Sequence, residues 1–210
     1  WQVAMGNHEF GWSKSFYPGT DSGGECGMVY KAYFPFAAQR ATTETINPGS
    51  YQPWYSYNYG SVHVTVMSTE HDFTPSSEQY KWIEADLAGV DRSVTPWVLF
   101  AGHRPMYVSS KWEGDGVESK TLMEAVEPLL IAHKVDLAIW GHFHAYTRTC
   151  SVVNETCASS NGSEGHGVVH IVMGTAGYEA TTQLKEPADQ AKWVASAMSY
   201  EYGFVRLDFL

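Results

Sequence analysis

The sequence predicts an α/β fold, and three observations support this prediction. Short apolar runs of strand length occur along the chain, and they alternate with segments in which apolar residues recur at helical spacing. A polar cluster that contains histidine or asparagine next to a glycine follows three of the predicted strands. The alternation is typical of a sheet covered by helices, and the clusters indicate where a site lies at one edge of that sheet.

Six segments have the apolar pattern of strands. In residues 61–67 three valines alternate with other residues, and residues 97–101 form a compact apolar run. The expected strands are residues 2–5, 61–67, 97–101, 135–140, 168–173 and 204–209. Residues 11–60 are rich in Gly, Pro, Ser and Tyr, so we expect long loops there.

Two segments have the pattern of surface helices. Thr74 and Pro75 are typical of an N-cap followed by a proline at the first helical position, and apolar residues recur at helical spacing over residues 80–90. Residues 119–134 form the second predicted helix, which we expect to be kinked or restarted at Pro128.

The composition of the 210 residues indicates one folded domain that extends over residues 1–210. Hydrophobic residues make up 44% of the chain, and a chain of this length buries on the order of 70% of its unfolded surface. With 13 Lys+Arg against 23 Asp+Glu the formal net charge is −10, which argues against binding to a nucleic-acid polymer. No apolar run approaches the ~20 residues of a membrane-spanning helix. The oligomeric state stays open.

Cysteines and glycosylation sequons favour a secreted or vacuolar/lysosomal location. Cys150 and Cys157 are seven positions apart, which indicates a short local disulfide rather than a zinc knuckle. Acceptor sequons begin at Asn154, within that loop, and at Asn161, just beyond it. Chance occurrence of so short a pattern is the alternative. Cys26 would then be unpaired, or paired with a cysteine outside this chain.

Candidate metal ligands follow three of the predicted strands. Asn7 follows residues 2–5, His103 follows residues 97–101, and His142 and His144 follow residues 135–140. Because the carboxyl ends of strands converge on one crevice in an open α/β sheet, we expect these side chains to meet. Imidazole nitrogens and an amide oxygen suit zinc, iron or manganese, and paired metals are a recurring arrangement for phosphoester hydrolysis.

The ordered motifs of the chain resemble a known family. The runs GNHEF, DSGGECG, TEHDF with EQYKWIEADL, WVLFAGHRPMY, GHFHAYTRTC and GTAGYE, in this order, resemble the C-terminal half of the purple acid phosphatases within the calcineurin-like metallophosphoesterases. The resemblance implies a four-layer α/β/β/α sandwich and a glycosylated, secreted or vacuolar hydrolase of phosphate esters. It also implies a dinuclear centre of Fe(III) beside Zn, Mn or Fe(II).

The resemblance assigns a role to each residue of the three clusters. Asn7, His103 and His142 resemble the family's ligands of the divalent ion, and His144 resembles the histidine on the iron site. His8 is similar to the histidine that contacts the phosphate or its leaving group, which makes it the candidate catalytic residue.

Three family ligands have no counterpart here: the aspartate of an upstream DxG motif, and the aspartate and tyrosine of a GDxxY motif. Asp21 falls in the wrong place in the order of motifs, and Asp115 is followed by Glu118 where the family has tyrosine. Because Trp1 is not an initiator methionine and no signal-peptide pattern precedes the first motif, we expect the N-terminal part of the domain to lie upstream. We therefore expect this chain to bind at most one divalent ion, through the amide and two histidines named above.

Other residues near the motifs have two readings each. Arg104 suits a phosphate oxyanion, as a substrate-binding group, but it equally suits a nearby carboxylate. His63 and His170 lie in strand patterns, so packing or hydrogen bonding is expected rather than metal binding. Tyr107 and Tyr146 would line the pocket or, more commonly for such residues, pack in the core.

The function expected from the resemblance is an acid phosphatase that hydrolyses small phosphate monoesters through its metal centre. The DSGGECG run resembles members that act as phosphodiesterases or nucleotide pyrophosphatases, which gives one alternative. The missing ligands favour the other alternative, an inactive fragment or a binding module.

Overall fold

The fold is described from a computed structural model, which defines residues 1–9, 27–34, 52–158 and 166–209. Several residues named above therefore lie outside the described residues: Asp21, Cys26, Asn161 and the side chain of Asp115. None of the described helices combines the length and the apolar character needed to cross a membrane.

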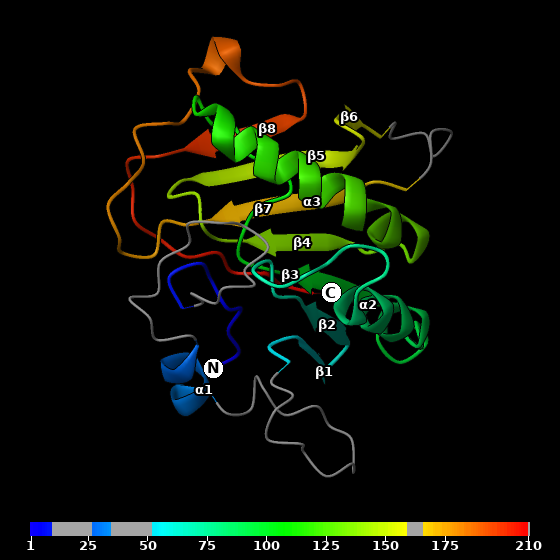
Figure 1. Ribbon diagram of the computed structural model, residues 1–210. Coiled ribbons are helices and arrows are strands. Elements are labelled where there is room, and N and C mark those ends of the chain that lie inside the picture. Colours follow the sequence, from blue (N-terminus) through cyan, green and yellow to red (C-terminus); the bar gives the residue numbers. More distant parts are fainter. Residues whose placement is uncertain (10–26, 35–51, 159–165, 210) are drawn as a thin grey trace.

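Eight strands form one mixed sheet (Figure 1). Along the sheet the order is β1-β2-β3-β4-β7-β5-β6, and β8 pairs with β5 beside β6. Neighbours from β2 to β7 are parallel, whereas β1, β5, β6 and β8 run antiparallel to their partners. The strands are β1 (Tyr55–Tyr59), β2 (Val62–Val66), β3 (Trp97–Ala101), β4 (Leu137–Trp140), β5 (Tyr146–Val153), β6 (Thr156–Cys157), β7 (Val168–Met173) and β8 (Val194–Met198).

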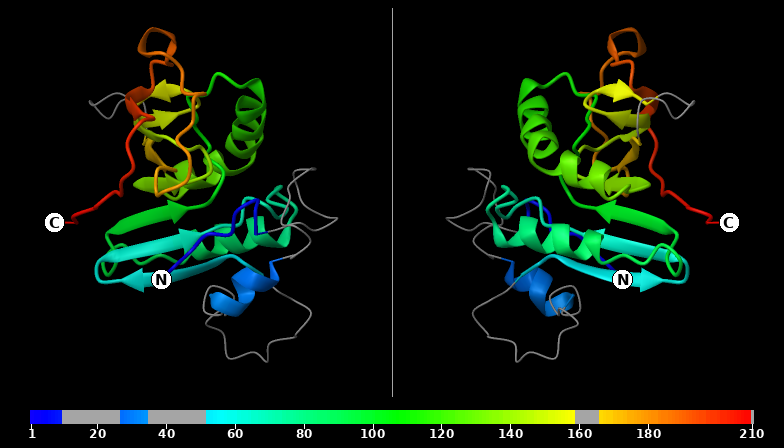
Figure 2. Two further views of the ribbon diagram at one scale, coloured as in Figure 1. Left: turned by 90° about the vertical axis from the view of Figure 1, so that its left-hand side faces the viewer. Right: turned by 90° about the vertical axis from the view of Figure 1, so that its right-hand side faces the viewer.

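Helices α2 (Glu78–Ala88) and α3 (Glu113–Ala132) cover one face of this sheet, and the C-terminal segment crosses the other (Figure 2). A short helix, α1 (Met28–Tyr33), lies near the N-terminus, and a 3-10 turn spans Pro187–Asp189. The α/β class predicted from the sequence is confirmed by this arrangement.

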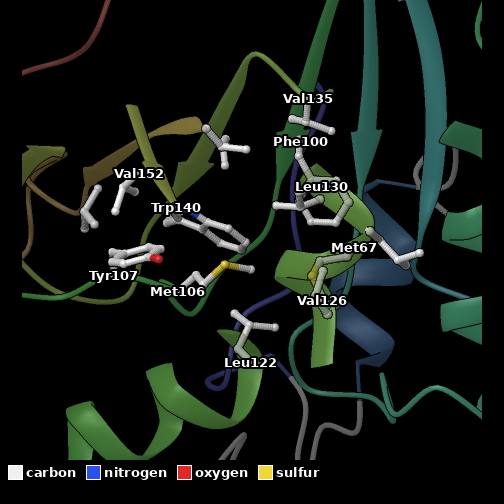
Figure 3. Packing of buried hydrophobic residues seen from close by; sticks show 14 of the residues in the cluster. Met67, Phe100, Met106, Tyr107, Leu122, Val126, Leu130, Val135, Trp140 and Val152 are labelled. Atoms are coloured by element: carbon white, nitrogen blue, oxygen red, sulfur yellow. The ribbon is translucent and has the colours of Figure 1, made fainter. Parts of the chain in front are cut away.

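The main core fills the space between the sheet and α3 (Figure 3). Side chains from the sheet and from the segments that follow its strands meet apolar side chains of α3 there. This cluster includes Met67, Phe100, Met106, Trp140, Leu122, Val126 and Leu130, each of which is almost completely buried. The core therefore holds the carboxyl ends of β2, β3 and β4 in place relative to one another.

The helix expected at Pro75 begins later, at Glu78. Thr74 does not act as its N-cap, because its N–H and hydroxyl both donate to the Asp72 carboxylate in a local turn. Ser77 caps the helix instead, by accepting a hydrogen bond from the backbone N–H of Tyr80. The second predicted helix begins at residue 113 and runs to residue 132 as one helix with Pro128 inside it.

Two strand predictions are wrong. Residues 2–5 and 204–209 are not in strands, although both have apolar patterns. Neither segment forms a ladder of backbone hydrogen bonds. In the first segment Met5 is fully buried, and in the second Phe209 contacts the Trp97 ring with centroids 5.8 Å apart while Phe204 is 89% exposed. The prediction of loops over residues 11–60 is also wrong in part, because α1 and β1 lie within that range.

The predicted disulfide is confirmed. Cys150 on β5 and Cys157 on β6 are bonded, with their Cα atoms 5.7 Å apart. The turn between these strands carries Asn154 and Glu155, both with positive φ. Asn154 is exposed at this turn, where a sequon is accessible.

Candidate metal centre

Two of the predicted ligands follow neighbouring parallel strands. His103 comes two residues after β3, and His142 comes two residues after β4. Backbone hydrogen bonds continue past the strand ends, because Gly102 N–H donates to Ile139 O at 3.1 Å and Gly141 N–H donates to His103 O at 2.9 Å. These bonds fix the two histidine loops side by side.

Asn7 reaches the same point from the N-terminal segment. Met5 is fully buried in a second apolar cluster with Tyr30 and Tyr55. Both tyrosine hydroxyls donate to the carbonyl oxygen of Val3, at 2.7 and 3.1 Å. The segment before Asn7 is therefore anchored without being a strand, which leaves the Asn7 amide at the edge of the sheet.

Three donor atoms form a close triangle at this edge. Asn7 Oδ1 lies 2.8 Å from His103 Nε2 and 3.2 Å from His142 Nδ1, and the two ring nitrogens lie 3.1 Å apart. The amide oxygen carries no proton, so protons on the rings cannot satisfy all three contacts at once. Three lone pairs that point at one another indicate a shared cation.

The dimensions of the triangle fit a divalent transition metal. Zn–N and Zn–O bonds are about 2.0–2.2 Å long, so two ligand atoms of one ion are about 2.8–3.1 Å apart at a right angle and about 3.3–3.6 Å apart at a tetrahedral angle. The three separations of 2.8 to 3.2 Å match the right-angle arrangement of a five- or six-coordinate ion. Among the described residues no three His, Cys, Asp or Glu side chains form a metal-binding group, so the third donor here is the amide of Asn7.

Burial keeps both imidazoles neutral. Burial and then the positive charge of Arg104 lower the pKa of His142 to about 3, and burial and then the repulsion that a proton on each of the two rings would create lower the pKa of His103 to about 3. A neutral imidazole has a free lone pair, which metal binding requires. His142 also adopts a positive φ of 62°, a conformation that is uncommon for a residue with a side chain and that clusters at functional sites.

Gly6 makes room for the His103 ring. A Cβ atom on residue 6 would lie 2.8 Å from His103 Cε1 and 2.9 Å from His103 Nδ1. The Glu9 carboxylate accepts a hydrogen bond from Gly6 N–H at 3.0 Å and so holds this turn against the ring. The glycine of the GNHE motif is thus needed for close packing next to the proposed ligand.

His144 and His8 lie at the rim of the triangle rather than in it. The His144 ring contacts the Tyr178 ring, with centroids 4.8 Å apart. His8 is exposed. Positive charge on either residue contributes to the lowered pKa values of His103 and His142, which places both near the site. The roles predicted for these two histidines stay predictions.

Arg104 pairs with carboxylates, as one of its two readings expects, and its role in binding phosphate stays a prediction. Its Nε donates to Glu70 Oε1 at 2.9 Å, and its Nη1 donates to Glu118 Oε2. Glu70 is fully buried and Arg104 is only 5% exposed. Glu118 Oε2 also lies 3.9 Å from the outer ring nitrogen, Nε2, of His142. The sequence interpretation identified neither glutamate as a partner of Arg104, although Glu70 lies in the TEHDF run after β2.

Two other histidines are hydrogen-bonded away from the site, as expected. His63 lies between Asn58 Oδ1 at 2.7 Å and Asp86 Oδ2 at 3.1 Å. His170 is buried and accepts a hydrogen bond from Trp140 Nε1 at 3.0 Å. Tyr107 also packs in the core rather than in the pocket.

Known proteins are similar to this chain in sequence. Residues 1–146 match the family model described as calcineurin-like phosphoesterase, and residues 167–210 match the one described as iron/zinc purple acid phosphatase-like protein C. A protein of Arabidopsis thaliana named probable inactive purple acid phosphatase 9 is 37% identical over 99% of this chain and 34% of its own length. A nucleotide pyrophosphatase/phosphodiesterase of Hordeum vulgare is 31% identical over 99% of this chain and 55% of its own.

Solved structures share the fold. The purple acid phosphatase PPD1 from yellow lupin (Lupinus luteus) seeds superposes with a TM-score of 0.71 at 30% identity, and the match covers 93% of this chain and 34% of that one. The GAP50 protein of Plasmodium superposes with a TM-score of 0.53 at 17% identity over 86% of this chain and 53% of that one, which shows a likeness of fold alone. This chain spans about a third of the length of several curated relatives that it matches.

Proposed function

The chain belongs to the purple acid phosphatases of the calcineurin-like phosphoesterase family and has the metallophosphoesterase fold, and from this we propose that it supplies the divalent-metal side of a centre that hydrolyses phosphate esters. The observation that carries the proposal is the triangle of Asn7 Oδ1, His103 Nε2 and His142 Nδ1, with sides of 2.8 to 3.2 Å. The activity of the whole protein is part of the proposal.

Each residue of the site has a role in this proposal. Asn7, His103 and His142 would hold zinc or manganese, which accept nitrogen and neutral oxygen ligands. When bound, such an ion polarises a phosphoryl oxygen. His8, exposed beside Asn7, would donate a hydrogen bond to the phosphate or to the departing oxygen of the ester. His144 would face the second metal, for which the family implies Fe(III).

For this chain we propose one divalent ion. Iron(III) is a hard cation that is retained by anionic oxygen ligands. Within the part of the chain that the structure describes, no three acidic, histidine or cysteine side chains surround His144 in a metal-binding group. The neutral triangle is the better-formed half of the centre, so zinc or manganese should bind there first.

The names of the relatives support two alternatives, a metal-binding module without turnover and an active phosphodiesterase. Four Arabidopsis thaliana relatives at 37% to 39% identity are named probable inactive, and they favour a module that binds metal without turnover. The Hordeum vulgare relative is named for nucleotide pyrophosphatase and phosphodiesterase activity, and it favours a diesterase over a monoesterase. We propose a small phosphate ester as the substrate in either active version.

Zinc titration of the purified chain by calorimetry tests the metal site. We expect one zinc ion per chain, and we expect His142→Ala and His103→Ala each to weaken binding at least about a hundredfold, since each removes one of three ligands. His133→Ala is the matched control, because this histidine caps the far end of α3. Two ions per chain, or equal affinity in His142→Ala and His133→Ala, would contradict the proposal.

Hydrolysis of two p-nitrophenyl esters then distinguishes a monoesterase, a diesterase and a binding module. Hydrolysis of p-nitrophenyl phosphate that His142→Ala abolishes indicates a monoesterase, and a preference for bis-p-nitrophenyl phosphate indicates a diesterase. Zinc binding without turnover of either ester indicates the binding module.

We also propose that the protein passes through the secretory pathway. The Cys150–Cys157 disulfide and the exposed Asn154 sequon support this route. Protein produced through the secretory pathway of a eukaryotic host should lose mass on treatment with a peptide N-glycosidase, and an unchanged mass would count against the route.

A further inference from the structure

The outer nitrogen of the His142 ring has a carboxylate as its neighbour. Nδ1 of this ring belongs to the triangle with Asn7 and His103, and Nε2, on the other side of the ring, lies 3.9 Å from Glu118 Oε2. A neutral imidazole carries one proton. On Nε2 this proton leaves Nδ1 with the lone pair that a metal needs, whereas on Nδ1 it covers that lone pair. The position of the proton therefore decides whether the ring can bind a metal.

Two oxygen atoms compete for this proton. Asn7 Oδ1 lies 3.2 Å from Nδ1 and would accept the proton there, whereas the Glu118 carboxylate would accept it at Nε2. A hydrogen bond to an ionised carboxylate is roughly twice as strong as one to a neutral amide. Asn7 Oδ1 also has a closer neighbour in His103 Nε2, at 2.8 Å, which can donate to it. Both comparisons favour a proton on Nε2 of His142.

The Glu118 carboxylate is held in place from two directions. Its Oε2 accepts a hydrogen bond from Nη1 of Arg104, whose Nε donates to Oε1 of the buried Glu70 at 2.9 Å. Next to Glu118 on α3, the Ser119 hydroxyl donates to the carbonyl oxygen of Pro105 at 2.9 Å. These bonds join the helix to the loop after β3, so the carboxylate keeps its place beside the His142 ring.

The space beside this contact fits one water molecule. A distance of 3.9 Å is longer than a direct hydrogen bond. Arg104, Glu118, His142 and Phe143 are among the residues that line a cavity of about 10 Å³, which is about the space that one water needs. A water held by two polar groups links them almost as well as a direct hydrogen bond does. The cavity therefore provides a path from the Nε2 proton to the carboxylate.

We propose that Glu118 is a positioning residue of the metal centre. It accepts the proton that His142 carries on Nε2, by way of one water molecule, and so keeps the Nδ1 lone pair directed at the metal. The inference rests on the proposed function, in which His142 is a ligand. In the sequence Glu118 is notable only for standing where a GDxxY motif would have tyrosine, and its place behind His142 comes from the fold.

NMR spectra of the ¹⁵N-labelled, metal-free chain at pH 7 test the tautomer, because long-range nitrogen–proton correlations distinguish Nε2–H from Nδ1–H. The His142 signals are those that His142→Ala lacks. We expect the Nε2–H form in the unchanged chain and a gain of the Nδ1–H form in Glu118→Ala. The matched control is Glu124→Ala, which removes an exposed carboxylate from the same helix and should keep the Nε2–H form. An Nδ1–H ring in the unchanged chain, or an unchanged tautomer in Glu118→Ala, would overturn the inference.

Zinc calorimetry of the same variants measures the effect on the metal site. Glu118→Ala should weaken zinc binding about 10- to 100-fold, as the loss of a group that orients a metal ligand does, and Glu124→Ala should bind zinc normally. Arg104 keeps Glu70 as its partner in Glu118→Ala, so this variant should fold, which its thermal unfolding transition checks. Equal zinc affinity in Glu118→Ala and Glu124→Ala would overturn the inference.

Glu118→Gln separates orientation from charge. It removes the same charge as Glu118→Ala but keeps a side-chain oxygen, and Arg104 selects that oxygen over the amide nitrogen because a guanidinium only donates hydrogen bonds. Glu118→Gln should therefore keep most of the zinc affinity and the Nε2–H form of His142. Equal losses of affinity in the two Glu118 variants would assign the effect to charge alone and overturn the inference. If the unchanged chain binds no zinc, the proposed function fails, and the tautomer of the metal-free chain still tests the role of Glu118.

Discussion

Replacing Gly6 by alanine should weaken zinc binding while the chain stays folded. The new Cβ atom would lie 2.8 Å from His103 Cε1, whereas ordinary van der Waals contact begins at 3.4 Å, so the ring must retreat by 3.4 − 2.8 = 0.6 Å. Metal–ligand distances are held within about 0.2 Å, so this displacement carries His103 Nε2 out of place. Residues that orient metal ligands typically change metal affinity about 10- to 100-fold, and we expect a loss in that range.

Zinc calorimetry measures this effect, and Gly116→Ala is the matched control. A Cβ atom on Gly116 meets nothing within 4 Å, so this variant should bind zinc normally and gain about 0.8–1.0 kcal/mol of stability from the higher helix propensity of alanine. Zinc affinity of Gly6→Ala within threefold of the unchanged chain would refute the packing argument. A loss of affinity accompanied by loss of the thermal unfolding transition would refute it too, because the effect would then be global.

Two further predictions concern the buried polar groups. Arg104→Met leaves the Glu70 carboxylate without its ion-pair partner in the core, so the free energy of unfolding in urea should fall by about 3–5 kcal/mol; a loss under 1 kcal/mol would show that the pair is not buried in solution. Burial lowers the pKa of His170 from 6.5 to about 3. Below pH 6.5 this histidine is therefore protonated in the unfolded chain but neutral in the folded chain. The free energy of unfolding consequently falls as the pH drops. Between pH 7 and pH 5 this amounts to about 2 kcal/mol, which His170→Asn should remove from the pH dependence of unfolding; an unchanged dependence would contradict it.

The site was more predictable from the sequence than its surroundings. A buried strand followed by glycine and histidine fixes where the side chain emerges, and β3 and β4 lie next to each other because parallel strands joined by a helix are usually neighbours. Those two rules bring His103 and His142 to the same edge. Asn7 contacts both histidines because residues 2–5, which precede it, also reach that edge, although they do not form a strand.

The errors had two causes: an apolar pattern can have more than one structural solution, and a strand can lack the pattern. Residues 2–5 have the apolar pattern of a strand, but no strand ladder forms there. The carbonyl oxygen of Val3 accepts hydrogen bonds from two tyrosine hydroxyls instead, and the side chain of Met5 is buried in the core. Strand β8 was missed because its sequence VASAM is mostly small residues whose side chains stay partly or fully exposed. The spacing of apolar residues indicates which side chains are buried, but it does not identify the groups with which the backbone N–H and C=O form hydrogen bonds.

The identity of the carboxylates that pair with Arg104 was beyond local sequence reasoning, and this pairing matters for the metal site. Glu70 and Arg104 are 34 positions apart, and they meet only because β2 and β3 end at the same edge of the sheet. An unpaired guanidinium so close to His142 would repel a divalent cation. With Glu70 and Glu118 both bonded to it, the three groups carry a formal charge of +1 − 2 = −1. The Arg104 network therefore compensates part of the positive charge of a metal ion held by three neutral ligands, and Glu118, 3.9 Å from His142 Nε2, places that compensation behind one of those ligands.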